Sequence, residues 1–317
     1  FPTRRSSDLA AARRDIETFT LLAELDWDQV LAEVGGKAPR EYGPVLANLP
    51  RWRGSSPFSF AELTELYRAN GAGLFARHRA FLWEDGALCP VEQPDCPGAD
   101  EMLGYELQRN RVIANTRAML EGNLVNNVLL YGDSGTGKSA TVKNLLTLPG
   151  FEALRLIEVQ KEGLADLPRL IRTLGGRRLK FILFIDDLAF DQDDKTYSAL
   201  KTILEGGLER RPANVAVYAT SNRRRLVRQT FSDRAGDEVD ASETIQEKTS
   251  LSDRFGLRIP YLALNQAEFL ELVEGMAEQA GIALDRDSLR AEAVKWEMRN
   301  PGRTPRTAKQ FIASLSL

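Results

Sequence analysis

The stretch of sequence that most constrains the fold is GDSGTGKS, residues 132–139. It matches the pattern G-x-x-x-x-G-K-[ST] at every defined position. An apolar run, residues 127–131, precedes the stretch, and a helical pattern of apolar residues follows it. A glycine-rich loop between a buried strand and a helix is typical of α/β proteins, so we expect a parallel sheet covered by helices.

The residues of this loop favour a phosphate-bearing ligand. Glycines let successive backbone N–H groups approach a pyrophosphate, and the start of the next helix adds the positive end of its dipole. The Lys138 ammonium would reach the outer phosphates, and the Ser139 hydroxyl would be a ligand of Mg²⁺. The residues expected to bind this ligand are Gly132, Asp133, Ser134, Gly135, Thr136, Gly137, Lys138, Ser139 and Ala140.

Two adjacent aspartates follow a second apolar run, residues 181–185. Like charges beside a buried strand are unfavourable unless a cation lies close to them. In a doubly wound sheet ligands bind beyond the carboxyl ends of the strands, so Asp186 would face the Mg²⁺ held by Ser139. Asp187 lies where a hydrolysing enzyme needs a base or a group that orients water. The alternative for either aspartate is a solvated turn.

A third apolar run ends in Ser221 and Asn222, which we expect beside the same crevice. The Asn222 amide could hold an attacking water or a terminal phosphate oxygen without competing for the metal, and an ordinary turn is the alternative. The basic residues that follow, 223–225 and 228, favour a solvated helix start over a nucleic-acid patch, because no aromatic residues are interleaved with them.

The rest of the pattern divides the chain into regions. Residues 10–98 read as a helical N-terminal region that ends in a linker over residues 86–98. Strands alternate with helices over residues 99–262, and helical segments follow over residues 263–317. The five expected strands cover residues 127–132, 154–159, 181–185, 215–220 and 257–262.

Composition narrows the partners and the chemistry. A formal net charge of −3 over 317 residues gives no overall attraction to nucleic acid, although a local basic patch could still bind it. Because no apolar run approaches the roughly 20 residues of a membrane span, we expect no membrane partner and a cytoplasmic location. Cys89 and Cys96 lack companions for a zinc site, so free thiols are expected. His78 is the one histidine, which leaves no Ser-His or Cys-His pair.

The first nine residues, FPTRRSSDL, can be encoded by a short-read sequencing adaptor translated in frame. We therefore expect residues 1–9 to be an artefact and leave them out of the fold prediction. The natural start would then lie upstream of them.

The motifs YGDSGTGKS, FILFIDD, YATSN, SLSDRFG and GRTPRTAKQF resemble the Walker A, Walker B, sensor 1, arginine finger and sensor 2 of AAA+ ATPases. More narrowly, phrases such as GYELQRN and LKTILEGGL resemble a bacterial AAA+ family catalogued as a domain of unknown function. The resemblance runs from about Phe75 to Leu315. It implies an α/β AAA+ P-loop core with a five-stranded parallel sheet, a C-terminal helical lid and a helical N-terminal region.

The resemblance also implies a role for each matching residue. ATP and Mg²⁺ would be the cofactors, with Asp186 binding Mg²⁺ through water. Asn222 would be sensor 1, Arg254 the arginine finger, and Arg306 sensor 2. Two positions depart from the common pattern. Asp187 replaces the usual glutamate and is one methylene shorter, and Pro305 replaces a glycine before Arg306.

The function that these motifs predict is Mg²⁺-dependent ATP hydrolysis that drives a conformational or assembly switch on a protein client, in a homo-oligomer. One alternative is a nucleotide-gated module that binds nucleic acid, similar to helicase loaders, with slow hydrolysis. Another is a protein-remodelling chaperone, which the lack of an obvious aromatic-glycine pore loop disfavours. The acidic segment 230–248 is expected to be a mobile loop and helix start on the partner-facing side, and a plain surface insertion is the alternative.

Overall fold

The computed structural model describes residues 13–18, 21, 26–37, 59–98, 100–189, 200–201, 203–204, 211–222, 251–300 and 302–315. The chain divides into two compact units, Phe1–Ala69 and Asn70–Leu317. The first unit includes α2 (Trp27–Lys37) and most of α4 (Phe60–Asn70). None of the helices in the described ranges is long and apolar enough to cross a membrane.

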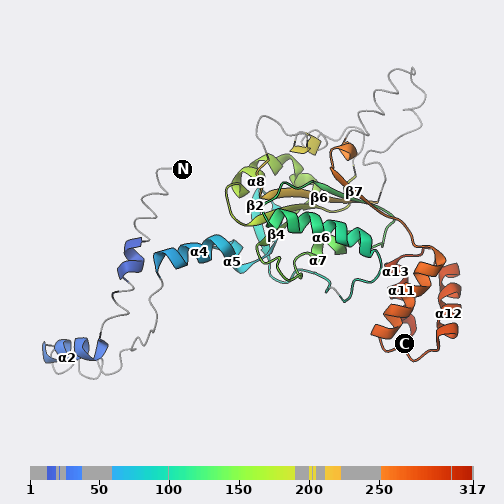
Figure 1. Cartoon of the computed structure of the whole chain (residues 1–317), viewed down its shortest axis with the longest axis horizontal. Coiled ribbons are helices and arrows are strands. Elements are labelled where there is room, and N and C mark those ends of the chain that lie inside the picture. The colour runs from blue at the N-terminus through green and yellow to red at the C-terminus, as the bar shows by residue number, and fades with distance from the viewer. Residues whose placement is uncertain are drawn as a thin grey trace, which may run out of the picture. The chain divides into compact units, whose positions relative to one another are not determined.

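A seven-stranded sheet organises the second unit (Figure 1), with the order β2-β1-β4-β5-β6-β3-β7. Every neighbouring pair is parallel except β1 and β2. The α/β class is therefore confirmed, and all five expected strands are present, but the sheet has two strands more than predicted. The strands are β1 (Ala80–Glu84), β2 (Ala87–Val91), β3 (Val128–Gly132), β4 (Leu154–Val159), β5 (Lys180–Ile185), β6 (Val215–Ser221) and β7 (Leu257–Tyr261).

The two additional strands form a hairpin over residues 80–91, where the end of the helical region and the start of the linker were expected, so the prediction for residues 86–98 was wrong at its start. The turn of the hairpin is Asp85–Gly86, and both residues have positive φ, 50° and 73°. Asp-Gly is a preferred sequence for such two-residue turns, because their twist matches that of the strands. Pro90 is compatible with β2 because this strand lies at the edge of the sheet.

Helices cover both faces of the sheet (Figure 1). On one face, α6 (Glu106–Leu120) and α7 (Lys138–Asn144) contribute to a hydrophobic core with β3, β4 and β5. On the other face, α8 (Leu167–Leu174) packs in a second core with β1, β5 and β6. A short 3-10 helix, Lys161–Asp166, leads into α8, and the four-residue α5 (Leu74–Arg77) precedes β1. All seven residues of β6 are buried, as expected for a central parallel strand.

The C-terminal helices α11 (Gln266–Gln279), α12 (Arg286–Arg299) and α13 (Pro305–Leu315) pack around a hydrophobic core of their own, which includes Phe269 and Phe311. The first of them begins at a capping box between Asn265 and Glu268. The Glu274 carboxylate joins α11 to α12, because it accepts hydrogen bonds from two arginines of α12. These helices occupy the region in which helical segments were expected. Their role as a lid stays a prediction.

Candidate functional site

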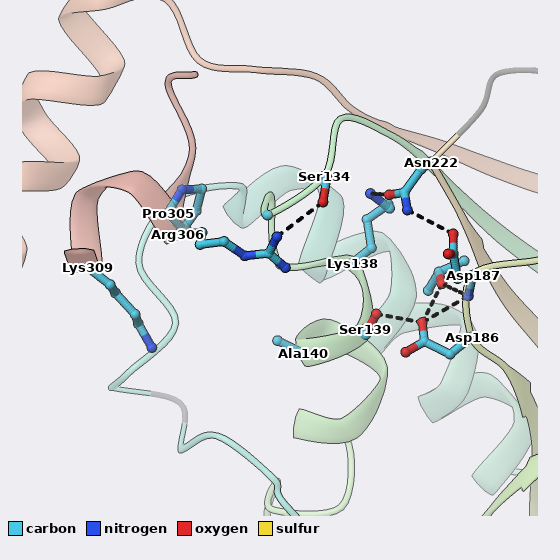
Figure 2. A pocket seen from close by; sticks show the side chains of 13 residues that line it. Ser134, Lys138, Ser139, Ala140, Asp186, Asp187, Asn222, Pro305, Arg306 and Lys309 are labelled. Atoms are coloured by element: carbon cyan, nitrogen blue, oxygen red, sulfur yellow. Dashed lines mark hydrogen bonds between the residues drawn. The ribbon is translucent and has the colours of Figure 1, made fainter. Parts of the chain in front are cut away.

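The site lies where β3, β5 and β6 end. After β3 the chain passes through α7 to β4, on one side of β3, whereas after β6 it crosses to β7, on the other side. The carboxyl ends of the neighbouring strands β3 and β6 therefore form a topological switch point, which is where open α/β sheets bind ligands. A cavity of about 570 Å³ opens at this position (Figure 2).

The loop after β3 forms one wall of this cavity, and it has a backbone that needs glycine. Gly137 has a φ of 89° immediately before α7, in the left-handed region that side chains disfavour. Gly132 has a φ of 137°, and a Cβ atom there would clash with the Tyr261 carbonyl of β7. Gly137 is thus favoured by its left-handed backbone, and Gly132 is required by the close approach of β7.

Lys138 is 6% exposed, and its ammonium has three hydrogen-bond acceptors. Its Nζ donates to the backbone oxygens of Gly132 (3.1 Å) and Asp133 (2.7 Å) and to Oδ1 of Asn222 (2.9 Å). Burial lowers the pKa of Lys138 below its ordinary value, whereas the carboxylates nearby act in the opposite direction. The lysine therefore points into the cavity with three acceptors that an anionic ligand could replace.

Ser139 and Asp186 meet across the cavity, because the Ser139 hydroxyl donates to Oδ1 of Asp186 at 2.6 Å (Figure 2). A hydroxyl and a carboxylate are oxygen donors of the kind that Mg²⁺ prefers. The described residues contain no cluster of three or more His, Cys, Asp or Glu side chains that could hold a metal. The Ser139 hydroxyl and the Asp186 carboxylate fit Mg²⁺, which is commonly bound by one or two carboxylates together with substrate phosphates.

Asp187 and Asn222 form a second pair in the cavity. The Asn222 amide donates from Nδ2 to Oδ1 of Asp187 at 2.8 Å, while its own oxygen accepts from Lys138. Asn222 thus connects the loop lysine to the second aspartate, as Figure 2 shows. Asp187 has a φ of 50°, in the left-handed region, which residues other than glycine rarely adopt, although aspartate adopts it more often than most.

The first turn of α13 forms the opposite wall. The Arg306 guanidinium donates to the Ser134 hydroxyl at 3.2 Å, and its backbone N–H donates to the Gly135 carbonyl at 3.2 Å. Pro305 is the first residue of α13, a position where proline is favoured because its missing N–H would have no partner in the helix. The proline that replaces a glycine here is therefore compatible with the start of the helix.

Some residues predicted for the site support it without lining it. Asp133 faces away from the cavity: its carboxylate accepts the Ala263 N–H at 2.6 Å, and its own N–H donates to the Tyr261 carbonyl at 2.9 Å. Thr136 stabilises the loop through a hydrogen bond from its hydroxyl to the Asp133 carbonyl at 2.8 Å. These contacts join the loop to β7 and to the connection that leads into α11.

Other predicted residues lie elsewhere. Arg254 is exposed and does not line the cavity, so a role for it within the same chain has no support in this geometry. The basic residues 223–225 and 228 and the acidic segment 230–248 lie outside the described residues. His78 is partly buried against Phe81, and both cysteines are free thiols, as predicted.

Three cavity residues were missed in the sequence: Thr220, Pro305 and Lys309. Lys309 lies one turn of α13 beyond Arg306, and Figure 2 shows both side chains on the cavity side of the helix. The spacing of three residues could have predicted this neighbour, because residues at i and i+3 share a helix face. Thr220 is the next-to-last residue of β6 and lies two positions before Asn222, the spacing at which side chains of an extended strand point to the same face.

Solved structures to which the chain is similar include RuvB of Thermotoga maritima, described as a Holliday junction branch migration motor. That structure is 17% identical to this chain, with a TM-score of 0.43, and the match covers 69% of this chain and 63% of that one. A mutant form of the same protein gives 16% identity, a TM-score of 0.44 and coverages of 69% and 64%. The chain thus spans a little under two thirds of these structures, and a similarity of this extent does not bear on activity.

No curated protein sequence matches the chain. A protein family does match it over residues 76–316, which include the whole cavity. The description of this family is "Protein of unknown function (DUF815)". The match covers most of the chain and agrees with the resemblance found in its motifs. The chain therefore belongs to the DUF815 family.

Proposed function

We propose that this chain binds ATP with Mg²⁺ and hydrolyses it, and that the nucleotide drives a conformational or assembly switch on a protein client. The observation that carries the proposal is the single cavity into which the Lys138 ammonium, the Ser139–Asp186 pair and the Asp187–Asn222 pair all point. The resemblance of these motifs to AAA+ ATPases supports the same function.

The loop and Lys138 are suited to the phosphates of a nucleotide. A cavity of about 570 Å³ is within the usual range for small-molecule sites. The lysine donors that now bond to two backbone carbonyls and an amide could turn to phosphate oxygens, which bind an ammonium more strongly because they are charged. We therefore assign Lys138 to the outer phosphates.

Ser139 and Asp186 would hold Mg²⁺. The hydroxyl can offer a lone pair to the metal while its O–H still donates to Oδ1 of Asp186, 2.6 Å away. Bound Mg²⁺ neutralises the charge that develops on a phosphoryl group as it is transferred. Asp186 fixes the direction of the serine lone pair, and this accounts for the first of the two adjacent aspartates.

Asp187 is our candidate for the group that orients or deprotonates the attacking water. Its carboxylate lines the cavity, and Asn222 holds it at 2.8 Å. An amide at this point can also bind a terminal phosphate oxygen or the water itself. Aspartate is shorter than the glutamate of most AAA+ proteins, and the left-handed backbone of Asp187 changes the direction in which the shorter side chain leaves the strand end.

Two arginines would complete the charge balance. Arg306 approaches the loop from α13 and is assigned to the phosphates as a sensor of the bound nucleotide. Arg254 is exposed and outside the cavity, a location that is compatible with action on the nucleotide of a neighbouring subunit. We therefore propose a homo-oligomer in which Arg254 contributes in trans.

The test is phosphate release from ATP by the purified chain. Wild-type protein should release phosphate when Mg²⁺ is present, and Lys138→Ala should abolish the reaction. Lys143→Ala is the matched control, because Lys143 belongs to the same helix but does not line the cavity. Turnover in Lys138→Ala that equals the wild-type rate would contradict the proposal.

A further inference from the structure

Thr220 contacts both adjacent aspartates, Asp186 and Asp187, and is 2% exposed. Its hydroxyl donates to Oδ1 of Asp186 at 2.5 Å and accepts the backbone N–H of Asp187 at 2.9 Å. Its backbone carbonyl accepts the N–H of Leu188 at 2.7 Å. One residue of β6 therefore holds three consecutive residues that follow β5.

The left-handed backbone of Asp187 explains why such a contact is needed. In an extended strand Asp186 and Asp187 would point to opposite faces of the sheet, because side chains alternate. A φ of 50° breaks this alternation, and both carboxylates line the same cavity. The conformation is unfavourable for a residue with a Cβ atom, so it persists where neighbouring groups hold it. The Thr220 hydroxyl and the Asn222 amide are two such groups.

The Thr220 hydroxyl also helps to orient the Asp186 carboxylate. Its Oδ1 accepts from the hydroxyls of Ser139 and Thr220 and, at 3.2 Å, from the Asp187 N–H. Three donors on one oxygen fix the rotation of the carboxylate, so that the other oxygen has a defined direction in the cavity. The hydroxyl of Thr220 thus contacts the first aspartate and the backbone of the second at the same time.

We infer that Thr220 is a positioning residue of this site: its hydroxyl sets the orientation of the Asp186 carboxylate toward the metal and the direction of Asp187 toward the attacking water. The inference rests on the proposed ATPase function and deepens it. The motif pattern assigns no role to this position, which lies two residues before Asn222. In this role Thr220 acts through its hydrogen bonds to the two aspartates.

The experiment compares Thr220→Val, which removes the hydroxyl and keeps the branched shape, with Thr220→Ser, which keeps the hydroxyl. Phosphate release is measured against Mg²⁺ concentration, and binding of a non-hydrolysable ATP analogue is measured with and without Mg²⁺. Thr220→Val should lower turnover about 100-fold, as small misplacements of catalytic groups do. It should also raise the Mg²⁺ concentration for half-maximal turnover and reduce the gain in analogue affinity that Mg²⁺ gives.

Analogue binding without Mg²⁺ should be unchanged in Thr220→Val, and Thr220→Ser should restore turnover to within a few-fold of wild type. Thr173→Val is the matched control, because the Thr173 hydroxyl bonds to a backbone carbonyl of α8 away from the cavity. If Thr220→Val melts below the assay temperature, Thr220→Ala replaces it, since it removes the same hydroxyl.

The outcomes separate the two proposals. A wild-type chain with neither turnover nor Mg²⁺-dependent binding of the analogue would overturn the proposed function itself. An active wild-type chain with Thr220→Val equal to it in turnover and Mg²⁺ dependence would overturn the role of Thr220 alone. Equal losses in the valine and serine variants would also overturn it, because the hydroxyl would then not be the group that matters.

Discussion

The two walls of the cavity differ in how firmly their side chains are held. The sheet wall contains six residues that are hydrogen-bonded to other parts of the same wall at distances of 2.5 to 3.1 Å: Lys138, Ser139, Asp186, Asp187, Thr220 and Asn222. The helix wall is the start of α13, which carries the cationic side chains of Arg306 and Lys309. Arg306 makes a side-chain hydrogen bond of 3.2 Å, and both side chains are exposed.

This difference indicates a division of labour. Groups that take part in chemistry benefit from a fixed arrangement, because a catalytic group that must reorganise contributes less to the rate. Groups that sense a ligand must be able to move when it binds. We therefore expect changes at the catalytic groups of the sheet wall to act mainly on turnover and changes in the helix wall to act on affinity, whereas Lys138, which we assign to the phosphates, is needed for both.

Among the changes that test this division of labour, the largest effect is expected from Asp187→Asn, which keeps the shape of the side chain and removes its charge. Turnover should fall by about 100-fold or more, the range that loss of a general base usually gives. ATP affinity should stay within about twofold, because the metal and phosphate ligands are intact. Phosphate release and equilibrium binding measure the two quantities. Wild-type turnover in this variant would show that Asp187 has no catalytic role and is part of an ordinary solvated turn.

The helix wall is tested by Arg306→Ala, which should weaken ATP affinity by about tenfold, since a hydrogen bond to a charged group is lost. Arg303→Ala is the matched control, because Arg303 precedes the same helix, pairs with Glu297 at 2.8 Å and does not line the cavity. Nucleotide titrations measure both. A loss of turnover with no loss of affinity would break the proposed division between the walls.

A smaller effect is expected from Lys309→Gln. The Lys309 side chain is exposed and makes no hydrogen bond or ion pair within the described ranges, so its attraction to phosphates is screened by water. ATP affinity should fall about two- to fivefold, as for other exposed charge pairs, and the loss should shrink at high salt. Lys295→Gln on α12 is the control, and an identical salt response in both variants would argue against a contact of Lys309 with nucleotide.

The smallest effect concerns the helices that carry this wall. Hydrogen bonds from Arg286 and Arg290 lower the pKa of Glu274 from 4.5 to about 2. A carboxyl whose pKa is lowered by folding contributes stability above its ordinary pKa, and this contribution is lost as the pH falls toward about 2.

The melting temperatures of wild type and Glu274→Gln should therefore differ most above pH 4.5 and converge below it. Thermal melts over that range measure the difference. A gap that does not change with pH would show that the carboxylate charge has no part in joining α11 to α12.

The local signals in the sequence predicted the sheet wall well. Five strands, the loop of residues 132–139 and the two aspartates all follow from short-range patterns, and the structure brings the polar ends of these strands into one cavity. The Thr220 contacts could not be predicted in this way, because they join residues 33 and 34 positions apart and depend on the register of β5 and β6.

The hairpin was missed for a different reason. Its Asp85–Gly86 turn is a recognisable signal, but the prolines and glycines around it favoured a linker. The edge position of β2, which makes Pro90 acceptable, becomes visible only when the order of the strands is known. The left-handed φ of Asp187 likewise depends on partners from another strand and has no signature in the sequence.

The central claim is that the cavity at the ends of β3, β5 and β6 is an ATP and Mg²⁺ site. The most direct measurement is calorimetric titration of a non-hydrolysable ATP analogue into wild-type protein and Lys138→Ala, with and without Mg²⁺. The account predicts saturable binding by wild type that Mg²⁺ strengthens and that Lys138→Ala loses. Equal binding by both proteins, or binding by neither, would contradict it.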